Sequence, residues 1–565
     1  MTRAAGARRG PAGPAVLAGG AALLAGLAQA ASIAWPWSGE PVWWLQLLSL
    51  GVFARLLLAS RSARQGALLG WVFATAWLTG TFWWLFISMH TYGGLAAPLA
   101  ALAVLGLAAF LGSYYAVASG CLRALAQSSR WQVAIIFGAF WLLAELARGQ
   151  WWTGFPWGAG GYAHVEGPLA VLARSIGVYG IGFIAAALAM LVAQARRSDL
   201  RSLRAWGLLG LAVAAWAGLA LQRHCAVELC HTPMRRPAPL SIALLQGNIP
   251  QDEKFQAGSG VPTALRWYAE QLRSAQALLV VAPETAIPLL PQQLIPGYLD
   301  SITARYTRAP QATNAAEVGT GATGGTGATD VTGETGGIGA SDQRPQAVLL
   351  GIPLGDMALG YTNSVMGFAP GQAAPYQYDK HHLVPFGEFI PPFFRWFTAM
   401  MNIPLGDFNR GAVGQAPFVW AGERIAPNIC YEDLFGEELG ARFADPAQAP
   451  TIFVNLSNIG WFGDSVAIDQ HLAISRMRAL EFERPMVRAT NTGATAIIDH
   501  RGVVTQRLPS HVRGVLAGDV LGRSGDVTPY AWWVSRWGLW PLWALGALVA
   551  GLAWLRPGRA ARPRG

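Results

Sequence analysis

Long apolar segments restrict the fold of this chain more than any other feature. A helix that crosses the hydrocarbon core of a bilayer needs about 20 predominantly apolar residues, and eight segments approach that length. Charged residues make up only 13% of the chain, whereas about 25% is usual in soluble domains. The sequence therefore predicts a membrane protein with a bundle of eight transmembrane helices. The predicted spans are 15–35, 41–58, 68–89, 95–121, 131–146, 169–193, 206–221 and 537–555.

The first apolar segment admits two interpretations. Arg3, Arg8 and Arg9 precede it and small residues end it, as in a cleaved signal peptide. Because six further spans follow directly, we favour a retained helix.

The distribution of arginine between the short loops predicts the orientation in the membrane, since positive residues gather in cytoplasmic loops. Arginines occur in the N-terminus, in the loops after the second, fourth and sixth spans, and in the tail 556–565. The alternate loops contain almost no Lys or Arg. We therefore expect both termini in the cytoplasm, and the large segment between the seventh and eighth spans outside.

Charge and cysteine content narrow the possible partners. The net charge is +10, but the basic residues are scattered in short clusters, which argues against a nucleic-acid partner. The four cysteines form no CxxC pair and have no metal-ligand spacing with histidine, so we expect neither a metal nor another cofactor. Cys225 and Cys230 could pair in an oxidising compartment, and the sequence leaves this open.

Residues 238–528 have a different pattern from the spans. Short strand-like runs alternate with stretches that suit helices, which indicates a layered α/β domain. The Gly/Thr-rich tract within 309–346 is too poor in apolar residues for a core, and we expect a flexible surface insertion. The predicted organisation is a domain of seven helices (1–230), the α/β domain (238–528), and a last helix with a basic tail (530–565).

Three motifs in the α/β domain place reactive side chains at or after predicted strands. VVAPETAIP contains Glu284, YDKHHLVPFGEFIP contains Lys380 and Glu388, and NICYEDLF contains Cys430. A carboxylate can accept a thiol proton, and a lysine ammonium can stabilise a thiolate and an oxyanion. These groups suffice for acyl transfer through a thioester. Taken singly, each also has an ordinary interpretation as a helix cap, a solvated charge or a small buried residue.

The motifs in this order resemble the nitrilase (carbon-nitrogen hydrolase) superfamily and, within it, the apolipoprotein N-acyltransferase family. The resemblance covers nearly the whole chain. It implies an αββα sandwich in the periplasm, attached to the bacterial inner membrane. It also implies transfer of an acyl chain from a membrane phospholipid to the α-amino group of the S-diacylglyceryl cysteine of an apolipoprotein; we expect phosphatidylethanolamine as donor and a monomeric enzyme. Further matching segments are WTGFPWGAGGY (152–162), QGNIPQDEKF (246–255), SNIGWFGDS (457–465) and RMRALEFERPMVRATNTG (476–493).

The resemblance assigns roles by position. Glu284 matches the general base of the family, Lys380 its oxyanion-stabilising lysine and Cys430 its acyl-accepting nucleophile. Glu388 matches a second essential glutamate, which assists the lysine or the incoming amine. The resemblance therefore implies a Glu-Lys-Cys triad.

Four further residues are expected to support the site or bind substrate. Tyr431 and Glu432 match the pair that follows the nucleophile, and the backbone N–H of Tyr431 is a natural second oxyanion donor. Phe255 stands where the family commonly has tryptophan, so an indole N–H is lost. Trp461 is kept, although Ile459 and Gly460 replace the usual residues before it.

Several alternatives remain at this point. A membrane-anchored carbon-nitrogen hydrolase would need only one anchor, and a scaffold without activity would not need the four reactive residues. Residues 150–162 form either an interfacial aromatic belt or the wall of an acyl-chain entrance. Glu145 and Arg148 are either a local i, i+3 pair or functional groups. Arg174 and Arg536 either contact lipid phosphate or extend to the interface, and 389–401 is a candidate lid.

Overall fold

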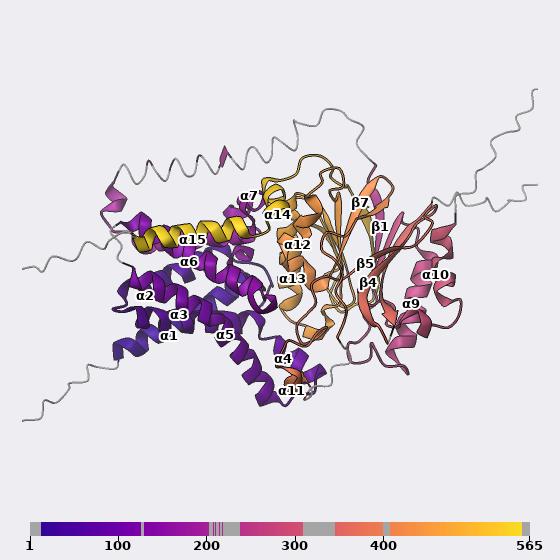
Figure 1. Cartoon of the computed structure of the whole chain (residues 1–565), viewed down its shortest axis with the longest axis horizontal. Coiled ribbons are helices and arrows are strands. Elements are labelled where there is room, and N and C mark those ends of the chain that lie inside the picture. The colour runs from indigo at the N-terminus through magenta and orange to yellow at the C-terminus, as the bar shows by residue number, and fades with distance from the viewer. Residues whose placement is uncertain are drawn as a thin grey trace, which may run out of the picture.

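The computed structural model describes residues 13–125, 129–202, 238–308, 345–356, 358–398, 400 and 407–555, together with a few helical positions between 207 and 218. Two parts lie end to end, a bundle of helices and an α/β domain (Figure 1). Most of the predicted span 206–221 and of the Gly/Thr-rich insertion falls outside the described residues. So do Cys225, Cys230 and both ends of the chain.

The helical part agrees in outline with the predicted spans. Four helical segments of the described residues are long and apolar enough to cross a membrane, or six if two bent pairs each count as one span. One pair joins α3 to α4 and η1 with a bend of 62°, and the other joins α14 to α15 with a bend of 88°. The helices are α1 (Gly13–Ile33), α2 (Trp43–Ala59), α3 (Ala63–Phe82), α4 (Leu85–Ile87), η1 (Ser88–Tyr92), α5 (Ala97–Ala124), α6 (Arg130–Gln150), α7 (Ala173–Ala193), α14 (Pro529–Trp537) and α15 (Trp540–Leu555).

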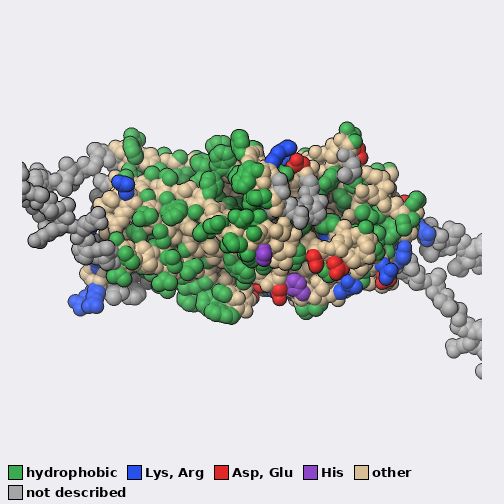
Figure 2. Space-filling model, turned by 90° about the horizontal axis from the view of Figure 1, so that it is seen from below, with side chains coloured by type: hydrophobic (Ala, Val, Ile, Leu, Met, Phe, Trp, Pro, Cys, Tyr) green, Lys and Arg blue, Asp and Glu red, His purple; other side chains and the backbone are tan. Residues whose placement is uncertain are grey.

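The bundle interior combines large aromatics with small residues. The rings of Trp77 in α3 and Trp141 in α6 stack at 5.3 Å. Gly26 lets α1 approach α3, since a side chain there would collide with the backbone carbonyl of Phe73. Small residues commonly allow such close approach between membrane helices. Apolar side chains also cover the outside of the bundle, whereas the charged side chains visible in this view lie mainly on the α/β domain (Figure 2). The helical part therefore has the surface of a membrane-embedded body.

The α/β domain contains two six-stranded sheets, with the orders β12-β1-β2-β3-β4-β5 and β11-β10-β9-β8-β7-β6. The strands β1, β2 and β3 are parallel, as are β7, β8 and β9. The strands are β1 (Leu240–Gln246), β2 (Leu279–Ala282), β3 (Ala347–Asp356), β4 (Gly360–Phe368), β5 (Tyr376–Asp379), β6 (Phe418–Trp420), β7 (Glu423–Ile429), β8 (Ile452–Ser457), β9 (Met486–Thr490), β10 (Ala496–Ile498), β11 (Val504–Arg507) and β12 (Gly514–Val520).

The side chains of each strand point alternately to the two faces of its sheet, and this produces the layers of the domain. In β1, Ile242 and Leu244 enter the core between the sheets, while Ala243 and Leu245 pack with residues of α9 (Gly260–Ser274), because successive strand side chains point to opposite faces. α9 and α10 (Tyr298–Thr307) cover the far face, and α12 (Gly436–Gly440) and α13 (Ala467–Phe482) cover the face toward the bundle (Figure 1). The domain is thus the expected αββα sandwich.

Helix α13 and the residues that follow it dock the domain on the bundle. Glu481 accepts a hydrogen bond from the backbone N–H of Val178 in α7 at 2.7 Å. Arg174, for which the sequence suggested a lipid contact or extension to the interface, forms an ion pair with Glu483 at 2.7 Å. The position of the α/β domain is therefore fixed by polar contacts to α7 as well as by packing.

The loop after α6 is anchored from within the bundle. Arg148 donates to the backbone carbonyls of Phe155 and Trp157, both at 2.8 Å, and Glu145 accepts from the N–H of Gly160 at 2.6 Å. Each side chain thus holds the loop, rather than forming only the local pair that their spacing suggests.

Candidate active site

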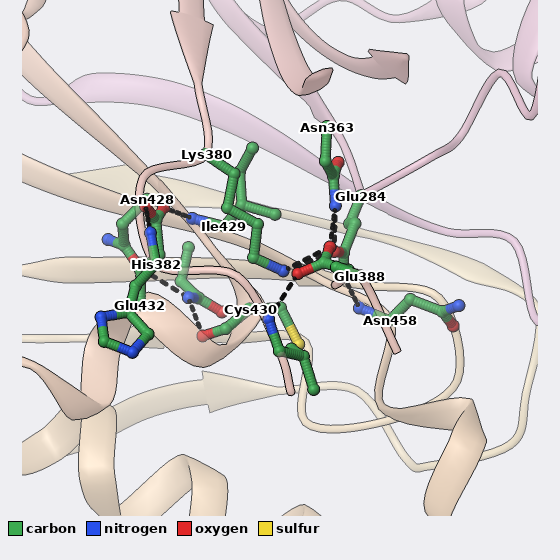
Figure 3. Close-up of polar contacts among 12 residues, drawn as sticks. Glu284, Asn363, Lys380, His382, Glu388, Asn428, Ile429, Cys430, Glu432 and Asn458 are labelled. Atoms are coloured by element: carbon green, nitrogen blue, oxygen red, sulfur yellow. Dashed lines mark hydrogen bonds and ion pairs between the residues drawn. The ribbon is translucent and has the colours of Figure 1, made fainter. Parts of the chain in front are cut away.

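The four reactive residues from the motifs converge where strands of both sheets end. Glu284 follows β2, Lys380 follows β5, and Cys430 begins the turn η7 (Cys430–Leu434) directly after β7. Glu388 lies in the loop eight residues beyond Lys380. Figure 3 shows the charged ends of Glu284, Lys380 and Glu388 meeting one another, with Cys430 next to them.

Glu284, Lys380 and Glu388 form one buried network. The ammonium of Lys380 lies 3.2 Å from Oε1 of Glu284 and 2.9 Å from Oε1 of Glu388. Asn363, in the middle of β4, donates through Nδ2 to the same two oxygens at 2.7 Å each. The remaining oxygen of Glu284 accepts from the N–H of Asn458 at 2.8 Å. Every group is nearly inaccessible to water, so the network is rigid and its charges are strongly felt.

The electrostatics of the site favour a charged ammonium on Lys380 and a neutral thiol on Cys430. Burial opposes the charge on Lys380, but the carboxylates of Glu284 and Glu388 outweigh it and raise the pKa of Lys380. Burial and then the Glu284 carboxylate raise the pKa of the Cys430 thiol from 9.0 to about 12, although Lys380 opposes this. At neutral pH the resting site thus holds a protonated thiol beside a carboxylate that can take the proton.

The turn that carries Cys430 is held in an unusual conformation. Cys430 has a φ of 51°, in the left-handed region that costs a residue with a side chain of order 1–3 kcal/mol. Glu432 fixes the turn from behind, since one carboxylate oxygen accepts from the N–H of Ile429 at 2.6 Å and from the hydroxyl of Tyr378 at 2.7 Å. Its other oxygen accepts from the N–H of His381 at 2.7 Å. Glu432 therefore links the turn that carries Cys430 to the loop that carries Lys380.

The other predicted residues lie around this centre. The hydroxyl of Tyr431 donates to the carbonyl of Gly154 at 3.2 Å, so it touches the loop after α6 rather than the carboxylates. Phe255 lies beside Lys254, whose ammonium is 6.0 Å from the ring centre. Trp461 meets Tyr92 of η1 edge to face at 5.9 Å. The side chains of Tyr431 and Trp461 therefore face the bundle, and the ring of Phe255 lies beside a buried lysine.

The structure adds residues that the motifs did not single out. Lys254 is buried, with 1% of its surface exposed, and its ammonium donates to the backbone carbonyl of Glu284 at 3.1 Å. Burial lowers the pKa of Lys254 to about 8, while Glu284 and Cys430 oppose this. Gln251 accepts from the side chain of Asn458 at 2.8 Å. Both residues belong to QGNIPQDEKF, so that segment packs around Glu284.

The candidate lid touches the bundle. Phe397 packs against the start of α5, at Leu95 and Ala100, whereas Phe393 and Trp396 are 90% and 64% exposed. Within the described residues, no group of three His, Cys, Asp or Glu side chains is arranged to hold a metal ion.

Both parts of the chain match known protein families. Residues 22–191 match the family described as the apolipoprotein N-acyltransferase N-terminal domain, and residues 241–525 match the carbon-nitrogen hydrolase family. An apolipoprotein N-acyltransferase of Verminephrobacter eiseniae is 64% identical over 92% of each chain. One of Ralstonia nicotianae is 44% identical over 86% of this chain and 85% of its own. A solved carbon-nitrogen hydrolase from Helicobacter pylori matches 55% of this chain and 95% of its own, with 13% identity and a TM-score of 0.33. The chain belongs to the apolipoprotein N-acyltransferase family.

Proposed function

We propose that this protein is an inner-membrane acyltransferase that N-acylates the S-diacylglyceryl cysteine at the N-terminus of apolipoproteins. The name shared by its relatives over most of the chain supports the lipoprotein acceptor and the phospholipid donor. The observation that carries the chemistry is the buried Glu284–Lys380 pair beside Cys430. These three residues form the proposed catalytic triad.

In the first half-reaction, the Glu284 carboxylate takes the proton of the Cys430 thiol, and the sulfur attacks the ester carbonyl carbon of a phospholipid. The resulting oxyanion is stabilised by the Lys380 ammonium and by the backbone N–H of Tyr431. Collapse breaks the ester C–O bond, and the leaving alkoxide takes the proton from Glu284. A lysophospholipid departs and Cys430 carries an acyl thioester.

In the second half-reaction, the neutral α-amino group of the acceptor cysteine attacks the thioester carbonyl. Glu284 takes a proton from the attacking nitrogen and returns it to the departing Cys430 sulfur. The products are an amide and the free thiol, so the enzyme is restored. Glu388 and Asn363 keep Lys380 in place through both steps, since both contact the network at 2.7 to 2.9 Å.

The setting of the site suits lipid substrates. Both substrates carry acyl chains, and the apolar surface of the bundle lies beside the catalytic domain (Figure 2). A thioester must be protected from water, for which we assign a lid role to the segment around Phe393 and Trp396, with Phe255 and Trp461 at the rim. Tyr431 and Glu432 support the site from behind.

The remaining assignments extend this proposal. We expect phosphatidylethanolamine as the donor and a monomeric enzyme with eight spans. Both termini lie in the cytoplasm and the catalytic domain, 238–528, lies in the periplasm. The seven helices of 1–230 and the helix of 530–565 flank it.

Acyl-adduct formation tests the mechanism. The purified protein is incubated with phosphatidylethanolamine in detergent micelles, and its intact mass is measured for wild type, Cys430→Ala and, as a control, Cys121→Ala. An acyl adduct is expected on wild type and on Cys121→Ala only. No adduct on wild type refutes the thioester, and an adduct on Cys430→Ala refutes the assignment of the nucleophile. Addition of a diacylglyceryl peptide should then yield the N-acyl peptide, whereas release of free fatty acid alone would indicate a hydrolase.

A further inference from the structure

Two neighbouring residues of α13 contact different parts of the protein. Gln470 contacts the helical bundle, and His471 contacts the turn that carries Cys430. Because α13 is the layer between the bundle and the second sheet (Figure 1), these contacts form a direct connection from the membrane helices to the nucleophile.

Gln470 is held by three hydrogen bonds from the bundle side. Its carbonyl oxygen accepts from the indole N–H of Trp84 at 3.0 Å and from that of Trp157 at 2.7 Å. Its amide nitrogen donates to the backbone carbonyl of Thr81 at 2.9 Å. The side chain is buried, so no water competes for these bonds, and the position of this turn of α13 is set by the bundle.

Hydrogen-bond chemistry fixes the tautomer of His471. Nδ1 lies 3.0 Å from Nη2 of Arg488, and a guanidinium can only donate. Nδ1 therefore accepts and Nε2 carries the ring proton. Nε2 lies 3.1 Å from the backbone carbonyl of Cys430 and 2.9 Å from Oδ1 of Asp433, which in turn forms an ion pair with Arg488 at 3.0 Å. The imidazole thus donates to the nucleophile turn.

Holding the carbonyl of Cys430 also orients the next N–H group. In a trans peptide the C=O and the following N–H lie in one plane and point in opposite directions. His471 and Asn455, whose Nδ2 is 3.2 Å from the same carbonyl, direct the oxygen of the Cys430–Tyr431 peptide toward α13. The N–H of Tyr431 then points the other way, as a second oxyanion donor must. The strained φ of 51° at Cys430 needs such fixed contacts to persist.

We propose that α13 couples the membrane bundle to the nucleophile, with Gln470 setting the helix position and His471 orienting the Cys430–Tyr431 peptide. His471 is a positioning residue, because it acts through the peptide and does not touch the substrate. This inference rests on the proposed role of Cys430. It predicts that a residue of the helical part, such as Trp157, affects the rate of acylation of Cys430 even when the acyl donor is water-soluble.

The test uses a donor that does not need the membrane. A short-chain, water-soluble p-nitrophenyl ester is mixed with the purified full chain, and acylation of Cys430 is followed by p-nitrophenolate release and by intact mass. Trp157→Phe removes the indole N–H on Gln470 and keeps an aromatic ring. Trp420→Phe is the matched control, because its indole N–H donates at 2.8 Å to the carbonyl of Leu278, inside the α/β domain and away from the bundle.

For Trp157→Phe we expect the acylation rate at saturating ester to fall about tenfold or more, as small displacements of catalytic groups do. The ester concentration that gives half the maximal rate should stay within about twofold of the wild-type value in Trp157→Phe. The acylation rate of Trp420→Phe should also stay within about twofold of the wild-type rate. Equal rates for the two tryptophan variants would overturn the coupling. Failure of the wild type to form any adduct would instead overturn the proposed function, so the two failures are distinguishable.

A second pair of variants tests His471 itself. His471→Gln keeps an N–H donor that can reach the Cys430 carbonyl, whereas His471→Leu has none. We expect His471→Gln to acylate at least about fivefold faster than His471→Leu at equal thermal stability, since of these two side chains only glutamine can donate a hydrogen bond to the Cys430 carbonyl. Equal rates in these two variants would show that the ring only fills space, and would refute the positioning role.

Discussion

Replacing Lys254 with methionine should make the protein more stable at pH 7 while slowing acyl transfer. Lys254 is 1% exposed, and burial lowers its pKa from 10.5 to about 8. This difference corresponds to about 3 kcal/mol by which the folded state disfavours the ammonium. Loss of the hydrogen bond to the Glu284 carbonyl offsets about 1 kcal/mol. The free energy of unfolding of Lys254→Met should therefore exceed that of the wild type by about 2 kcal/mol at pH 7.

The sign of the pH dependence follows from proton binding. Between about pH 8 and 10.5 the unfolded chain holds the proton of Lys254 and the folded protein does not, so wild-type stability rises with pH over this interval relative to the variant. The advantage of Lys254→Met is full below about pH 8 and disappears by about pH 10.5. Acylation of Cys430 should nevertheless be slower in the variant, because a cation near the thiolate is lost.

Denaturant unfolding in detergent at pH 7 and pH 10, followed by tryptophan fluorescence, measures the stability difference. Arg266→Met, on the exposed face of α9, is the control for loss of one positive charge, and we expect a change within about 0.5 kcal/mol at both pH values. A Lys254→Met protein that is less stable than wild type at pH 7, with the same deficit at pH 10, would refute the reasoning.

Two further predictions concern the carboxylates. The Glu284 carboxylate contributes to the raised pKa of Cys430. In Glu284→Gln, Cys430 should therefore react faster with iodoacetamide at pH 8 than in the wild type, while acyl transfer is lost. Slower alkylation of Cys430 would contradict the assigned electrostatics. Glu388→Gln removes a carboxylate 2.9 Å from the Lys380 ammonium and should lower the acylation rate by about 10- to 100-fold. A wild-type rate in single-turnover acylation by phospholipid would show that Glu388 does not position Lys380.

Local patterns were sufficient to indicate a layered α/β domain, whereas the centre of the site was located through the resemblance to a known family. Strand residues such as Ile242 and Ala243 alternate between two cores, and this period of two is visible in the sequence. Glu284, Lys380 and Cys430 come directly after strands or nearly so, but β2 and β5 are separated by two strands and β7 lies in the other sheet, so their meeting depends on the packing of the two sheets. The layered α/β arrangement is present in the structure, and these residues lie close together there, while their catalytic roles stay predictions.

Contacts between distant segments could not be predicted in this way. Asn363 lies inside β4, and nothing local marks it as the bridge between two carboxylates. In the sequence Lys254 resembles an ordinary surface lysine, and only the folded structure shows that it is buried. The predicted span 537–555 corresponds to α15, but the separate helix α14 before it was not predicted; Gly538, between the two helices, adopts a positive φ of 53° that permits a sharp turn. These features depend on tertiary packing, which a single sequence does not display.

The pairing of the first and last strands of the α/β domain has an architectural consequence. β1 and β12 are antiparallel neighbours, with Leu240 opposite Val520, so the chain enters and leaves the sandwich at adjacent points. A domain whose ends meet can be inserted into a host protein without separating the host segments on either side. The α/β domain can thus be viewed as a module inserted into the chain of the helical part. Exchange of the whole segment between Leu240 and Val520 with that of a relative should leave the bundle intact.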